Sequence, residues 1–339
     1  MVQLLFIILA LFPQDESLLE KFEKEVERVV IKGKPSLVSI TAHVVVNQHP
    51  RFEEHDDLSL SGVIYRKEGY IVTSSAFLSE AAQIHVRLMD QREVEATFVG
   101  SDPKTRIAVL QIKAGDLQPV ELGRVSEIRA GAIGIALGNP FGLSGAAAMG
   151  YVCGEERSIQ VGGQRFDRMI QLSTPIYPGD VGGIVVDSRG RLMGILHSAY
   201  RTGEDMDLSS ILRQLHGKHR GSRWEGFSFA TPVDRVCFVA DRIIKYGKMI
   251  RGWIGVSVVA RKKKGIVITS IATESPAKKA GLQKGDVLVS FGGNRVTNLS
   301  DFQDQVEEML EPKEVSVVYR REGTERTTLV KVEIESGGK

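Results

Sequence analysis

A glycine-rich loop at Pro178–Gly183, PGDVGG, is the segment of this sequence whose residue types could do chemistry. Three of its residues are Gly179, Gly182 and Gly183. Glycine adopts backbone conformations closed to other residues, so such a loop can turn several N–H groups toward one negatively charged oxygen. The residue after Asp180 is Val181, which has no nucleophilic atom. The loop therefore offers oxyanion donors without an attacking group.

Three further segments accompany this loop: GYIVTSSAF at Gly69–Phe77, DPKTRIAVLQI at Asp102–Ile112 and ALGNPFGL at Ala136–Leu143. In order and separation, the four segments resemble the signature blocks of HtrA/DegP-type serine proteases. The resemblance covers about residues 35–335. It implies a mainly β fold, with a two-barrel trypsin-like (chymotrypsin-fold) domain followed by a PDZ domain.

The resemblance also assigns the family's catalytic triad to positions of this chain. The family histidine falls on Ala76, its aspartate on Arg106 and its serine on Val181. Acyl transfer needs a hydroxyl to attack, an imidazole to take its proton and a carboxylate to orient the imidazole, and these three residues supply none of them. We therefore expect no catalytic residue at these positions and a pseudo-protease that is not an enzyme. The remnant oxyanion loop would be Gly179, Asp180, Gly182 and Gly183.

Two alternatives concern the vacated site. The glycines could preserve a cleft that binds peptide, or they could be what the barrel needs in order to close. A displaced group could also restore catalysis, and the polar residues nearby in sequence are Ser74, Ser75, Asp180 and His197. An HtrA-type serine endopeptidase with a rearranged active site is therefore the alternative function.

The long side chain at position 106 would fill the space left by the missing imidazole. We expect the Arg106 stem to pack above Ala76, with its guanidinium reaching solvent or a carboxylate, of which Asp180 is the nearest by family geometry.

The pattern of elements divides the chain into segments. A signal-like or anchoring segment at 1–14 precedes a charged helical lead-in at 15–34. Short β-branched strands, separated by Gly, Asp and Pro, then fill a trypsin-like domain at 35–247 that a helix at Pro232–Tyr246 closes. The PDZ domain follows at 251–335, with a short helix ended by Gly281 and a longer one in LSDFQDQVEEML.

The second domain resembles PDZ domains through SPAKKAGLQKGDVLVSFGGNRVTNLSDF at Ser275–Phe302. The resemblance places the carboxylate-binding loop at Trp253, Ile254, Gly255 and Val256. Such a domain adds an extended C-terminal peptide beside its own edge strand, while loop N–H groups hold the terminal carboxylate. The alternative is a groove occupied by the protein's own chain.

The composition of the chain argues against nucleic-acid, metal and cofactor binding. The chain has 339 residues, is 42% hydrophobic and 25% charged, and has a formal net charge of +2, which gives no basis for nucleic-acid binding. The two cysteines and seven histidines show no ligand spacing, so we expect no metal and no cofactor.

The basic run Arg261–Lys264 is either a solvated hairpin turn or a charge patch facing a ligand. A longer connection at Tyr200–Trp224 is either a tolerated surface loop or a docking element.

The apolar run Leu4–Phe12 is too short to cross a bilayer as a helix and fits a signal-peptide core, a short membrane-surface anchor or a misassigned start. We therefore expect a periplasmic or other extracytoplasmic protein, with membrane association through the N-terminus left open.

The favoured function is non-catalytic binding of polypeptides or protein C-termini, as a scaffold, chaperone-like factor or regulator in protein quality control. Active HtrA-type relatives and a homo-oligomer are left open as partners.

Overall fold

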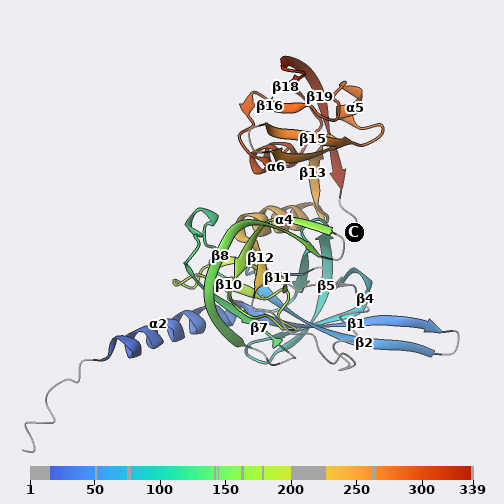
Figure 1. Cartoon of the computed structure of the whole chain (residues 1–339). Helices are drawn as coiled ribbons and strands as arrows, with labels where there is room; N and C mark the ends of the chain where they lie inside the picture. Colours follow the sequence, from blue (N-terminus) through green and yellow to red (C-terminus); the bar gives the residue numbers. More distant parts are fainter. Residues whose placement is uncertain are drawn as a thin grey trace, which may run out of the picture.

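The computed structural model describes residues 16–49, 52–74, 78–140, 143, 145–161, 164–177, 179–199, 227–261 and 264–336. Figure 1 shows two β-barrels side by side and a third, smaller sheet domain that stands on them. The mainly β class predicted from the sequence is confirmed. The segments at 1–14 and Tyr200–Trp224 lie outside the described residues.

The first barrel closes in the strand order β1-β2-β3-β6-β5-β4. Its strands are β1 (Leu37–His49), β2 (Phe52–Ile64), β3 (Tyr70–Ser74), β4 (Ala81–Leu88), β5 (Glu93–Asp102) and β6 (Ile107–Ile112). Alternating apolar side chains from all six strands fill the interior. β1 and β2 continue outward as a long antiparallel hairpin (Figure 1).

The second barrel closes in the order β10-β11-β12-β9-β8-β7. Its strands are β7 (Ile133–Gly138), β8 (Ala146–Val161), β9 (Gln164–Leu172), β10 (Ile184–Val186), β11 (Leu192–Ala199) and β12 (Ser228–Pro232). The loop with the sequence PGDVGG immediately precedes β10, so barrel closure fixes one end of the loop.

Two helices complete this part of the chain. Helix α4 (Val233–Tyr246) begins after Pro232, ends at Gly247 with φ of 70°, and buries one apolar stripe in the core that both barrels share. Helix α2 (Leu18–Gly33) begins with a capping box in which Ser17 and Glu20 satisfy each other's backbone N–H groups. Its C-terminal half packs on the same core, while its N-terminal half extends away from the barrels (Figure 1).

The third domain is a sheet in the order β13-β19-β18-β16-β15-β14, with β17 paired to β16. Its strands are β13 (Ile250–Trp253), β14 (Val256–Arg261), β15 (Gly265–Ile271), β16 (Val287–Phe291), β17 (Asn294–Arg295), β18 (Lys313–Arg321) and β19 (Thr324–Ser336). The short helix α5 (Pro276–Lys279) and the helix α6 (Leu299–Glu307) appear where the sequence predicts them. Short 3-10 turns at Lys34–Ser36, Leu78–Glu80 and Val125–Glu127 complete the described elements.

Candidate functional site

The loop before β10 is tied to the first barrel through Ser61 of β2. The Ser61 backbone N–H donates to the Val181 carbonyl at 3.0 Å, and the Ser61 hydroxyl donates to the Gly179 carbonyl at 2.7 Å. The same hydroxyl accepts the Asn139 N–H at 2.8 Å. Ser61 is fully buried, so these bonds are shielded from water and hold the loop between the barrels.

The glycines of this loop have distinct structural roles. Gly179 and Gly182 have φ of 96° and 88°, in the left-handed region that favours glycine. A Cβ on Gly182 would lie 2.2 Å from the Ser61 carbonyl oxygen and 2.4 Å from the Thr73 hydroxyl. Gly182 is therefore required for the close contact with the first barrel, which supports the packing interpretation for this residue.

The backbone N–H groups of the loop divide into two sets. Those of Asp180, Gly182 and Gly183 donate to the carbonyls of Tyr177, Leu196 and Asp180. In the described part of the chain, the N–H groups of Gly179 and Val181 have no acceptor. Two backbone N–H groups two positions apart therefore remain available for an oxyanion.

The carboxyl group of Asp180 titrates close to neutral pH. Only 7% of this residue is exposed, and its Oδ2 accepts the Tyr177 N–H at 2.8 Å. Burial raises the pKa of the Asp180 carboxyl to about 6. The hydrogen bond from the Tyr177 N–H lowers this pKa, but by less than burial raises it. The carboxyl can therefore exchange a proton in the neutral range.

The expected contact between Arg106 and Asp180 is not found. Arg106 lies in the turn after β5 with φ of 54°, and its guanidinium stacks 5.0 Å from the centre of the Phe166 ring. Burial lowers the pKa of Arg106. No ion pair joins Arg106 to Asp180 in the described structure, and the guanidinium lies over the aromatic ring on β9 instead. Ala76 lies outside the described residues, so the packing of Arg106 above it stays a prediction.

His197 on β11 is buried, at 6% exposure. Its ring packs against Phe166 with a centroid distance of 4.3 Å. Burial, aided by the positive charge of Arg106, lowers the pKa of His197 to about 3. The imidazole is therefore neutral at physiological pH and a weak base.

Ser74, at the end of β3, is the described hydroxyl that lies nearest in the chain to the vacated histidine position. It is 3% exposed, and its backbone N lies 3.0 Å from the point that a Cβ on Gly182 would occupy. Its hydroxyl has no hydrogen-bond partner among the described residues. Ser75, the neighbouring hydroxyl, lies outside them.

The predicted carboxylate loop connects β13 to β14. The carbonyls of Ile254 and Gly255 accept the N–H groups of Ala277 and Ala272, each at 2.9 Å. The N–H groups of Ile254 and Gly255 donate to no acceptor in the part of the chain that the structure describes. Gly255 has φ of 77°, and a Cβ there would lie 2.2 Å from the Ser275 Cβ. The loop thus points carbonyls inward and leaves two N–H groups available.

Strand β14 follows this loop directly and lies at the end of the sheet order. It pairs with β15 on one side, and no described strand pairs with its other side. The four predicted residues, Trp253, Ile254, Gly255 and Val256, are thus brought together at the start of an open edge. The alternative, a groove filled by the protein's own chain, finds no support among the described strands.

A buried ion-pair network, which no local sequence pattern indicates, connects the third domain to the first barrel. Arg251 on β13 is 2% exposed and pairs with Asp102 at the end of β5 and with Glu307 of α6 at 3.3 Å. Glu307 also pairs with Arg235 of α4 at 2.5 Å. Asp102 accepts hydrogen bonds from the Thr105 hydroxyl and the Lys104 N–H, so the same carboxylate shapes the turn that carries Arg106.

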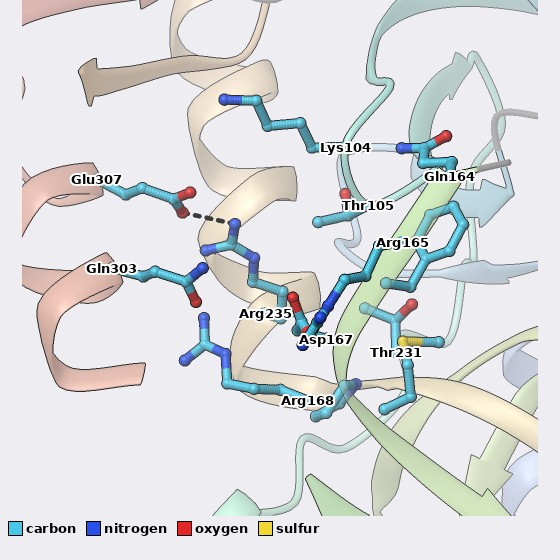
Figure 2. A pocket seen from close by; sticks show the side chains of 13 residues that line it. Lys104, Thr105, Gln164, Arg165, Asp167, Arg168, Thr231, Arg235, Gln303 and Glu307 are labelled. Atoms are coloured by element: carbon cyan, nitrogen blue, oxygen red, sulfur yellow. Dashed lines mark hydrogen bonds and ion pairs between the residues drawn. The ribbon is translucent and has the colours of Figure 1, made fainter. Parts of the chain in front are cut away.

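A cavity of about 340 Å³ lies between the domains beside this network. Figure 2 shows Arg235 directed toward Glu307, with Arg168 and Gln303 on the same side. Arg168 on β9 also bonds Ser300 and Asp304 of α6, at 2.7 and 2.9 Å. Each of these interdomain arginines already has a carboxylate partner.

Comparison with known proteins agrees with this architecture. Residues 60–195 match the trypsin-like peptidase domain, and residues 252–332 match the PDZ domain. The serine endoprotease DegS of Haemophilus influenzae is 34% identical over 75% of this chain and 74% of its own. The chain belongs to the HtrA family of serine endoproteases. This membership confirms the trypsin-like and PDZ assignments.

Two further relatives show how far the likeness extends. A probable periplasmic serine endoprotease, DegP-like, of Hahella chejuensis is 32% identical over 80% of this chain and 56% of its own. The chain spans about half the length of several such curated relatives. The structure of the HtrA-type protease AlgW with a tripeptide covers 91% of this chain and 97% of its own, at 29% identity and a TM-score of 0.76.

The expectation that this chain is not an enzyme is corrected by these comparisons, because relatives at about this identity are named serine endoproteases. Ala76, Arg106 and Val181 lack catalytic side chains, whereas oxyanion donors are backbone N–H groups, which every residue other than proline has. The assignment of no catalytic residue to Ala76, Arg106 and Val181 stays a prediction.

Within the described ranges, no group of three His, Cys, Asp or Glu side chains could hold a metal ion. Among the same residues, no helix has the length and apolar character needed to cross a bilayer.

Proposed function

We propose that this chain is an HtrA-type serine endopeptidase with a rearranged active site, which takes polypeptides by their C-termini through its PDZ domain. The observation that supports the peptidase most directly is the pair of available N–H groups at Gly179 and Val181. Each donor aimed at a developing oxyanion lowers the barrier to acyl transfer by about 3 kcal/mol.

The attacking group must come from outside the three family positions. We assign it to Ser74, whose hydroxyl has no hydrogen-bond partner among the described residues and which borders the loop at Gly182. The Ser74 oxygen would attack the peptide carbonyl and release the amine, and water would then hydrolyse the ester. Asp180, with a pKa of about 6, is the loop residue able to exchange the proton near neutral pH.

The decisive experiment combines hydrolysis with covalent labelling. The purified protein is incubated with casein over hours and, separately, with a fluorophosphonate probe, and the labelled peptide is identified by mass spectrometry. We expect slow hydrolysis of casein and a label on Ser74. Both should be abolished in Ser74→Ala. Both should be retained in the control Ser79→Ala, which changes an exposed serine of the following turn. The absence of hydrolysis and of label in the unaltered chain would refute the peptidase. A label elsewhere would refute only the role of Ser74.

Peptide binding is supported by the open edge of β14 beside the N–H groups of Ile254 and Gly255. The N–H groups would hold a terminal carboxylate while the peptide extends along β14. Fluorescence anisotropy should show that peptides ending in an apolar residue bind more weakly once their C-terminus is amidated. Equal affinities would show that the carboxylate is not recognised.

We also propose an extracytoplasmic location, because the DegP-like relatives are named periplasmic. In that compartment the substrates would be exposed C-termini of damaged or misassembled proteins. Fractionation of the host, with antibody against this chain, tests the location. Recovery in the cytoplasmic fraction would contradict it.

A further inference from the structure

Two residues of the basic run, Arg261 and Lys264, contribute to a charged hollow on the PDZ sheet. Cations from separate chain segments line a cavity of about 380 Å³: Arg261, Lys264, Lys284 and Arg320. The only acid among the lining residues that the structure describes is Glu322. The charge of the hollow is therefore strongly positive, although the whole chain is nearly neutral.

Sheet register explains how these residues meet. Val259, Val267, Val287 and Arg320 lie in one row across β14, β15, β16 and β18. Side chains in such a row share a face, and the alternate positions Ile266 and Leu288 are buried in the core. The hollow thus lies on the outer face of the sheet, with Val267 and Val287 among its lining and basic side chains around them.

The positive charges of the hollow are mostly uncompensated. No ion pair involves Arg261, Lys264 or Lys284 anywhere in the described structure, and all three are exposed. Arg320 pairs with Glu325 at 2.8 Å. By contrast, the neighbouring Arg321 pairs with the buried Asp286 at 2.7 Å.

We propose that this hollow binds a phosphate group carried by a larger molecule. Several convergent cations suit a phosphate, which spreads its charge over three or more oxygens, better than a single carboxylate. The cavity is larger than a phosphate alone, and the valines in its lining would contact the attached group. The group is either the headgroup of an anionic phospholipid or a soluble phosphate ester. The hollow includes Arg261 at the end of β14, whereas the carboxylate loop lies at the start of that strand.

The test measures both sources with the full chain. Co-sedimentation uses vesicles of phosphatidylcholine with or without about one-third phosphatidylglycerol, and calorimetry uses inorganic pyrophosphate. Exposed ion pairs each strengthen binding only a few-fold and are screened by salt. We expect Lys264→Glu with Lys284→Glu to weaken the binding of at least one probe about tenfold or more at 50 mM salt, and less at 300 mM.

The matched control reverses two exposed lysines at the open end of the β18–β19 hairpin. Lys313→Glu with Lys331→Glu changes the net charge equally but leaves the hollow intact. Binding of the vesicles alone identifies a lipid headgroup, and binding of pyrophosphate identifies a soluble phosphate. The proposal is overturned if neither probe binds, or if both double variants weaken binding equally, since overall charge would then explain the effect.

Discussion

Truncation of Arg251 tests the buried network that joins the PDZ domain to the first barrel. The side chain is 3% exposed, and its partners Asp102 and Glu307 have side chains that are 1% and 16% exposed. Arg251→Ala would leave the Asp102 carboxylate buried with only the Thr105 hydroxyl and the Lys104 N–H as donors. Removal of one partner from such a pair costs about 3–5 kcal/mol, because the remaining charge cannot regain its hydration.

A matched control lies in the same interface. Arg168→Ala removes a contact to Asp304, whose side chain is 40% exposed, and water can replace much of what is lost. We expect its cost to be about 1 kcal/mol or less. Urea unfolding monitored by circular dichroism and by tryptophan fluorescence measures both variants. Because the network spans two domains, Arg251→Ala should also separate their unfolding into two transitions.

Two results would contradict this reasoning. One is a cost for Arg251→Ala no larger than that for Arg168→Ala. The other result concerns the double variant Arg251→Met with Asp102→Leu. This variant removes both charges, so we expect it to recover much of the stability that Arg251→Ala loses. If the double variant were less stable than the sum of its single changes, the unpaired charge would not be the cause.

The remaining predictions concern the two loops. Burial raises the pKa of Asp180 to about 6, above the unfolded value of about 3.9, so its protonated form is favoured in the folded chain. The contribution of Asp180 to the free energy of unfolding is fully present below about pH 4. It is lost as pH rises through 6, by about 2–3 kcal/mol in total. Asp180→Asn should therefore reduce the pH dependence of stability in melting curves recorded from pH 4 to 8. Gly255→Ala should abolish detectable peptide binding in anisotropy titrations, because the added Cβ meets Ser275. The control is Gly285→Ala, where φ is 98° and no described atom outside the chain neighbours lies within 4 Å of the added Cβ, and this variant should bind peptide as the unaltered chain does. If the two alanine variants bind peptide equally, the Gly255 loop does not hold the carboxylate.

Local patterns made most of the fold predictable from the sequence. Alternating β-branched residues between turn residues marked strands such as β5 and β6, and Gly247 marked the end of α4. Such signals work because they depend on residues close together in the chain. The four residues of the carboxylate loop were instead assigned from the resemblance to PDZ domains, and their role stays a prediction.

Contacts between distant segments could not be predicted in this way. The Arg251–Asp102 pair joins residues 149 positions apart, and no periodicity relates them. Arg106 contacts Phe166 because β9 passes beside the turn that follows β5, which only barrel packing determines. The family geometry suggested Asp180 instead, since it placed the partner by triad position rather than by the surfaces that meet.

The loop before β10 shows why a missing side chain does not by itself define what remains of a site. Its shape is set by backbone contacts: Ser61 to Gly179 and Val181, and Gly182 against the first barrel. None of these contacts uses the residue-181 side chain, which packs instead beside the first-barrel core. Val181→Ser should therefore leave the loop unchanged and place a hydroxyl where an apolar side chain packs against the first-barrel core. If Ser74 is the nucleophile, this variant should gain no activity, and any large gain would show that position 181 still determines catalysis.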